Sequence, residues 1–200
     1  MSSTDPGAQA PTQRTRHRPR RVAVAALVAL GIATTLCVFG LLITPDYGRG
    51  LLGQEAAAAY RLKNQLATAV LVLALVQLTL AGWMYGVFSG ARARPRTVPV
   101  LHRIGGAGLF VLSVPIALHC LLTYGVQLSS PRTAVHSLVG CFFYGAFAAK
   151  VILVRSHRLP GWALPVTGGL LVVLVGVLWY SSVFWYWSGS AWPFTVAEGI

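Results

Sequence analysis

Five long apolar stretches, separated by short polar segments, divide the chain. Each has at least the ~20 residues that a helix needs to cross the ~30 Å hydrocarbon core of a bilayer. The expected spans cover about 22–44, 62–88, 99–124, 132–154 and 162–186. The pattern predicts an all-α polytopic membrane protein, built as a bundle of five transmembrane helices.

The segments between the spans carry the residues that end helices. Residues 45–53 are rich in turn formers, Pro99 suits the first turn of a helix, and Pro160 precedes the last span. Residues 127–131 form a tight connection, which predicts that the third and fourth helices are antiparallel neighbours. Gln77 is a lone polar residue within the second span, where a hydrogen bond to another helix is expected.

Both ends of the chain differ from its apolar centre. Residues 1–21 hold five arginines without apolar periodicity, which predicts a disordered basic tail. The first apolar run is too long for a signal peptide and lacks a good cleavage site, so it is expected to remain as an anchor. Residues 189–200 are expected to form a short tail on the other side of the membrane.

Charge sets the expected orientation. The net charge of +12 does not indicate a nucleic-acid-binding groove, because the charges fall almost wholly between or outside the apolar runs. With the N-terminus inside, twelve of the sixteen basic residues lie on the cytoplasmic side and four outside. The sequence thus predicts a cytoplasmic N-terminus and an extracytoplasmic C-terminus. The preference for Arg over Lys, with abundant Ala, Val and Gly, suggests a bacterium, and hence its cytoplasmic membrane.

Three cysteines, Cys37, Cys120 and Cys141, lie inside apolar runs. They form no C-x-x-C pair and no C-x-x-C-H motif. This argues against a disulfide framework, a zinc ribbon and covalently attached c-type haem.

Two histidines are the main candidates for chemistry. His119 lies about five residues before the outer end of the third span, and His136 about four residues after the outer start of the fourth. At ~1.5 Å per residue, both lie roughly 6 to 8 Å below the outer surface. Two imidazoles at equal depth on adjacent antiparallel helices are what a haem with two axial histidines requires. Arg132 and Lys63 are outer cations that could pair with haem propionates. An interhelical polar contact and a different metal ion remain alternatives for the two histidines.

The inner half offers weaker candidates. His102, followed by Arg103 and two glycines, could be a second haem ligand or part of a quinone site. His157 falls past a helix end in a basic loop, where a solvated histidine is the simpler interpretation. Lys150 either extends to the inner headgroups or contacts a propionate or an anionic semiquinone.

Several stretches resemble known families. The matched histidines are similar to those of transmembrane b-type cytochromes of the ascorbate-reducible and ferric-reductase kind. Leu-His-Arg-Ile-Gly-Gly at 101–106 is similar to a His-Arg-x-Ser/Thr-Gly element in the cytochrome b anchor of succinate dehydrogenase, although Gly105 replaces the hydroxyl residue. The third to fifth spans, with His-Ser-Leu-Val-Gly-Cys from 136 and Leu-Pro-Gly-Trp-Ala-Leu-Pro from 159, resemble an uncharacterised family of actinobacterial five-helix membrane proteins.

The leading hypothesis is a b-type cytochrome-like membrane protein that transfers electrons through haem b between the third and fourth helices. Its partner would be a redox protein or a membrane quinone, and it could serve as the membrane subunit of an oxidoreductase. No G-x-G-x-x-G follows a strand, so a nicotinamide or flavin site is not expected. The alternative is a non-haem membrane protein, such as a metal-binding protein, a small transporter subunit or a structural anchor.

Overall fold

A computed structural model of the chain describes residues 17–87, 95–156 and 159–188. These residues are almost entirely helical, and among them no strand is present beyond an isolated bridge between Leu51 and Gln54. The elements in chain order are α1 (His17–Leu41), α2 (Ala56–Met84), α3 (Thr97–His119), η2 (Cys120–Tyr124), α4 (Pro131–Val154), α5 (Ala163–Trp179), η3 (Tyr180–Phe184) and α6 (Trp185–Ser188). The segments η2 and η3 are π-helical continuations of α3 and α5.

The predicted five-helix, all-α bundle is confirmed. Among the described residues, five helical segments are long and apolar enough to cross a membrane, from Arg20–Leu41 at the N-terminal end to Ala163–Ser188 at the other. The boundaries of α1 and α2 differ most from the expected spans. Helix α1 begins at His17, inside the stretch predicted to be disordered, because arginine is a good helix former and extends the apolar run, and it ends at Leu41 rather than 44. Helix α2 begins at Ala56, ahead of the span expected from about 62, where four consecutive alanines favour a helix, and it ends at Met84 rather than 88. The rest of the N-terminal tail and the C-terminal tail lie outside the described residues.

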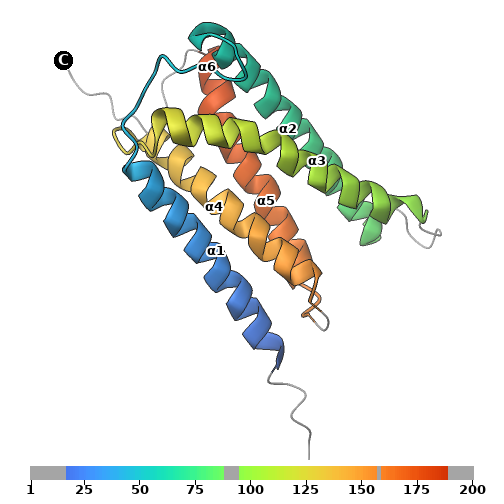
Figure 1. Cartoon of the computed structure of the whole chain (residues 1–200). Helices are drawn as coiled ribbons and strands as arrows, with labels where there is room; N and C mark the ends of the chain where they lie inside the picture. The colour runs from blue at the N-terminus through green and yellow to red at the C-terminus, as the bar shows by residue number, and fades with distance from the viewer. Residues whose placement is uncertain (1–16, 88–94, 157–158, 189–200) are drawn as a thin grey trace, which may run out of the picture.

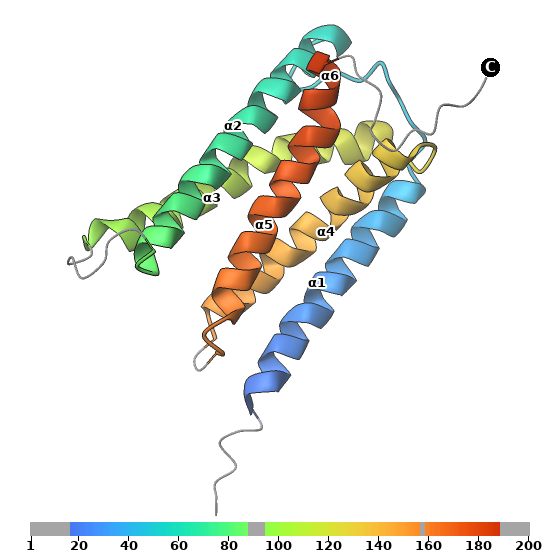
Figure 2. The same ribbon diagram turned by 180° about the vertical axis from the view of Figure 1, so that it is seen from behind.

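The helices pack in the order α1, α4, α5, α2, α3. Figure 1 shows two arms, one of α1, α4 and α5 and the other of α2 and α3, and Figure 2 shows the same arrangement from behind. We call the end at which α3 passes into η2 and α4 begins the outer end, following the predicted orientation. The arms meet there and diverge toward the inner end (Figures 1 and 2).

The expectation of a closely packed α3–α4 hairpin therefore needs correction. The two helices are joined by a short connection, but the backbone of α3 packs along α2, while that of α4 packs along α1 and α5. Aromatic side chains bridge the separation. The Phe110 and Phe147 rings stack with centroids 4.5 Å apart, and the Tyr144 hydroxyl donates a 3.0 Å hydrogen bond to the Ser113 carbonyl oxygen.

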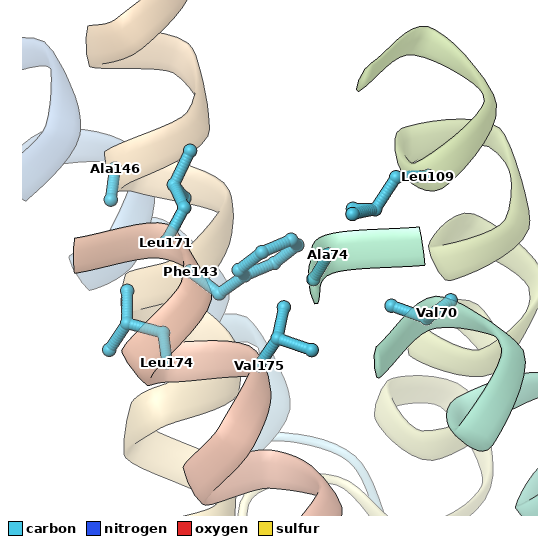
Figure 3. Packing of buried hydrophobic residues seen from close by; sticks show 8 residues of the cluster. All are labelled: Val70, Ala74, Leu109, Phe143, Ala146, Leu171, Leu174 and Val175. Carbon is cyan, nitrogen blue, oxygen red and sulfur yellow. The ribbon is translucent and has the colours of Figure 1, made fainter. Parts of the chain in front are cut away.

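The main apolar core joins the two arms. Phe143 of α4 is almost fully buried, and Figure 3 shows its ring reaching toward Ala74 of α2 and Leu109 of α3. Leu171, Leu174 and Val175 of α5 complete the cluster. Large side chains fill the space between helices that are set apart.

The contact between α1 and α4 is of the opposite kind, with small residues and close backbones. A Cβ atom placed on Gly145 would lie 2.2 Å from the carbonyl oxygen of Ala29. Ala25 and Ala29 of α1 are buried against Ala149 and Leu153 of α4. Small residues allow this approach, as they do in other membrane helix pairs.

Candidate functional site

The loop that follows α1 is fastened over the outer end of α3. The amide of Asp46 donates a 2.7 Å hydrogen bond to the Thr123 carbonyl oxygen, and the Arg49 guanidinium donates one of 3.1 Å to the Leu122 carbonyl oxygen. At Gly125, φ is +65° and a side chain would collide with the carbonyl oxygen of Gly40, which explains the glycine there. The loop therefore covers the segment just after His119.

His119 is one of the buried polar residues of this end, with 6% of its surface exposed. Its Nε2 lies 3.1 Å from the backbone carbonyl oxygen of Arg49. Because a carbonyl oxygen only accepts hydrogen bonds, Nε2 carries the proton and donates. The Nδ1 atom then keeps a lone pair, and it is buried without a hydrogen-bond partner among the described residues.

His136 has the complementary arrangement. Its Nδ1 lies 2.8 Å from the Oγ of Ser181, and the Ser181 hydroxyl donates to the Val177 carbonyl oxygen at 2.7 Å. Since the single hydroxyl proton is used there, Ser181 accepts from Nδ1–H. The lone pair of His136 is therefore on Nε2. The ring also has a hydrogen-bonding contact with the Leu178 backbone.

A buried cation lies near both histidines. Lys63 of α2 is 9% exposed, and its Nζ lies 4.4 Å from the ring centroid of Tyr60 and 4.6 Å from that of Tyr124. Its charge acts on His119 and on His136. Within the described ranges no carboxylate pairs with Lys63, so the two aromatic faces hold it by cation–π interactions.

Arg132, the other predicted outer cation, is already engaged by the protein. Its guanidinium carbon lies 3.8 Å from the ring centroid of Trp185, and its Nη1 donates a 3.0 Å hydrogen bond to the Ser181 carbonyl oxygen. Arg132 and His136 thus meet the same residue of η3. The structure places both predicted cations at the histidine end, Lys63 between α2 and η2 and Arg132 beside η3.

The two π-helical segments flank this cluster. Segment η2 follows His119 directly, and η3 contains Ser181. Such widened turns are frequent at functional sites. Thr123 in η2 and Ser181 in η3 have 0% exposure, and the Thr123 hydroxyl has no hydrogen-bond partner among the described residues. Two of the three largest fully buried side chains among the described residues are therefore polar, and the third is Val183 of η3.

The other predicted residues lie in the inner half or outside the described residues. The ring of His102 is close to the backbone of Gln77 and feels the charge of Lys150, whereas Arg103 is exposed. His157 falls in a part of the chain that the structure does not describe. The expectation that Gln77 hydrogen-bonds another helix is wrong, because both of its amide atoms are buried without a partner among the described residues.

Arg49 and Ser181 belong to the site but were not predicted. Arg49 contributes a backbone oxygen to His119, and any residue type could do so, so the sequence holds no signal for it. Ser181 is half of a Ser-Ser pair within the terminal aromatic cluster, which is a weak signal for a buried hydrogen-bonding group. In the described ranges no three His, Cys, Asp or Glu side chains gather as they would around a protein-coordinated metal ion.

Residues 22–194 match the model of a family described as a family of unknown function (DUF6529). The chain belongs to this family. The matched region includes all five membrane helices, so the outer histidine cluster and the inner polar residues both lie within the shared domain. No curated protein and no solved structure matches the chain.

Proposed function

We propose that this member of the DUF6529 family is a membrane-embedded b-type haem protein, with His119 and His136 as its axial ligands at the outer end. The observation that carries the proposal is the state of the two imidazoles. Each has one nitrogen held by a hydrogen bond to a protein partner, and the other nitrogen of His119, Nδ1, is buried without a hydrogen-bond partner among the described residues. In a metal-binding histidine, one ring nitrogen typically makes an orienting hydrogen bond while the other ligates the metal.

Each histidine has one ring nitrogen that can ligate haem iron, and that nitrogen differs between the two residues. His136 offers Nε2 while its Nδ1–H is held by Ser181. His119 offers Nδ1 while its Nε2–H is held by the Arg49 carbonyl oxygen. Neutral imidazole ligates metals through either nitrogen, so both can serve. The two histidines lie on α3 and α4, near the end of the bundle where the two arms meet.

The surrounding charge also suits a haem. Porphyrin propionates are anions, and the site contains cations without paired acids in the described residues. Lys63 is buried, and its charge reaches both histidines. We assign propionate binding to Lys63 first, because Arg132 already contacts Trp185 and Ser181.

Haem bound here would supply one-electron transfer, and the protein would supply the environment. His119 and His136 would set the ligand field, and Ser181 would fix the tautomer of His136. The loop fastened through Arg49 would limit water access from the outer side. The expected partners remain a redox protein at the outer face and a quinone in a bacterial cytoplasmic membrane.

A structural role is the second candidate, and the same contacts favour it. The hydrogen bond from His119 to Arg49 ties the outer loop to α3, and the bond between His136 and Ser181 ties α4 to η3. Interhelical hydrogen bonds of this kind contribute ~0.6 to 2 kcal/mol in membrane proteins. Under this function the histidines stabilise the bundle and bind no cofactor.

Optical spectra separate the two functions. The full chain, expressed with ample haem precursor and purified in detergent, should show a b-type α-band in the reduced-minus-oxidised spectrum. His119→Ala and His136→Ala should each abolish the band, while His102→Ala, the matched histidine change at the inner end, should retain it. A haem-free wild-type protein whose His119 and His136 variants are merely less stable would support the structural role and end the haem proposal.

A further inference from the structure

The inner half of the bundle contains a second polar group that the proposed haem does not use. Gln77 of α2 is 8% exposed, and neither its Nε2 nor its Oε1 has a hydrogen-bond partner among the described residues. A buried polar group without a partner costs ~1 to 3 kcal/mol. The amide lies against α3 at Gly105, where an added Cβ atom would be 2.1 Å from Nε2.

Two further residues face the same region from other helices. His102 of α3 lies close to the backbone of Gln77, and its Nδ1 is also buried without a partner in the described ranges. Lys150 of α4 lies in the same half of the bundle, and its Nζ is 3.8 Å from where a Cβ atom of Gly168 of α5 would be. Three helices thus contribute an amide, an imidazole and an ammonium group to the inner half of the bundle.

The position of these groups suits a ligand that arrives through the membrane. Gln77 lies seven residues from the inner end of α2, or ~10 Å along the helix, and Lys150 four residues from that of α4, or ~6 Å. Gln77 and His102 belong to one arm of the bundle and Lys150 to the other, and the arms diverge toward this end (Figures 1 and 2). All three residues lie within apolar helices long enough to span a membrane, so a ligand that dissolves in the bilayer is at their depth.

We propose that Gln77, His102 and Lys150 bind the head group of a quinol, the reduced form of a membrane quinone. An amide has one group that donates and one that accepts, so its ligand must also do both. A quinol hydroxyl donates to Oε1 and accepts from Nε2. A phosphodiester only accepts, and it would leave Oε1 unpaired. The Lys150 ammonium donates a hydrogen bond to a hydroxyl oxygen of the same head group.

This assignment deepens the proposed function, on which it rests for the destination of the electrons. Binding itself requires no haem. Measuring binding rather than electron transfer therefore keeps a failure of the quinol site distinct from a failure of the haem site.

The test uses the full chain in phosphatidylcholine nanodiscs under argon, titrated with duroquinol by isothermal calorimetry. Wild type should bind at one saturable site. Gln77→Met and His102→Ala should each weaken binding about tenfold, which corresponds to one lost hydrogen bond of ~1.4 kcal/mol. Gly105→Ala should do the same, because its methyl group displaces the Gln77 amide.

Matched controls distinguish a site from general disruption. Gln65→Met changes an exposed glutamine of the same helix, and Gly108→Ala adds a methyl group with only an ordinary 3.9 Å contact to Leu73. Both should bind duroquinol within twofold of wild type. Gln77→Met should melt at the same temperature as wild type or higher, because it removes an unpaired buried amide. A binding constant unchanged in both Gln77→Met and His102→Ala overturns the proposal.

Two other ligands would give distinct results, and either result also overturns the quinol proposal. Phosphatidylglycerol that competes with duroquinol, and whose own binding is weakened by Gln77→Met, would identify a lipid headgroup site. A second haem band lost in His102→Ala but not in His136→Ala would identify His102 as a haem ligand.

Discussion

The contact of α1 with α4 gives a sharp test of the packing, through Gly145→Ala. The added methyl group would lie 2.2 Å from the Ala29 carbonyl oxygen, 3.0 Å from its carbonyl carbon and 3.3 Å from its Cα. All three neighbours are backbone atoms of α1, so no side-chain rotation can relieve the overlap. The two helices must separate, by about 1 Å at this point, before the carbonyl oxygen reaches an ordinary contact distance.

The energetic cost follows from that separation. A gap of 0.5 to 1 Å removes roughly a quarter to a half of the dispersion energy of the atoms concerned. The buried atoms at risk belong to Ala25, Ala29, Ala149 and Leu153. Overpacking of this kind costs ~1 to 3 kcal/mol. We expect Gly145→Ala to lower the free energy of unfolding by about 2 kcal/mol.

Gly176→Ala is the matched control, because an added Cβ atom on that α5 glycine meets nothing within 4 Å. It should leave stability unchanged or raise it by up to ~1 kcal/mol, since alanine is the better helix former. Denaturation in mixed micelles, followed by far-ultraviolet circular dichroism, measures both variants. Equal stability of Gly145→Ala and Gly176→Ala would refute the close α1–α4 contact.

Two polar residues near the outer end provide further predictions. Ser181→Ala should lower the free energy of unfolding by ~1 to 3 kcal/mol and weaken haem retention ~10- to 100-fold, because the Nδ1–H of His136 loses its acceptor. Ser182→Ala is its control, because the described contacts of that hydroxyl stay within its own helix. Denaturation and haem absorbance measure both variants. Similar losses in the two would contradict the role of Ser181 as the acceptor for His136. Thr123→Val removes a fully buried hydroxyl that has no partner among the described residues, so stability should stay equal or rise by ~1 kcal/mol. Denaturation midpoints check this, and a loss of more than ~1 kcal/mol would show that the hydroxyl is engaged.

The sequence predicts the helices well and their partners poorly, for a physical reason. Long apolar runs specify a membrane helix by length alone, which is why five were found. The same runs are apolar on every side, so they do not indicate which face meets protein and which meets lipid. The packing of α3 on α2 depends on details of shape, such as the fit of the Gln77 amide against Gly105, that no periodic pattern reveals.

The candidate site, like the fold, is predicted by the sequence only in part. The positions of His119 and His136 near the ends of two successive spans follow from counting residues along helices. Their hydrogen-bond partners cannot be found by counting. The partner of His119 is a backbone oxygen of a loop, and the partner of His136 is a serine 45 residues away. The tautomers, and hence the nitrogen that each histidine could offer, depend on those partners alone.

The divergence of the two arms has a consequence for the membrane itself. A bundle that spreads toward one face occupies a larger cross-section in that leaflet than in the other, so it is wedge-shaped (Figure 1). The lateral pressure on a wedge-shaped bundle depends on the lipids, because some concentrate the pressure in the hydrocarbon centre and others at the headgroups. The angle between the arms is therefore expected to respond to the lipid composition of the bilayer.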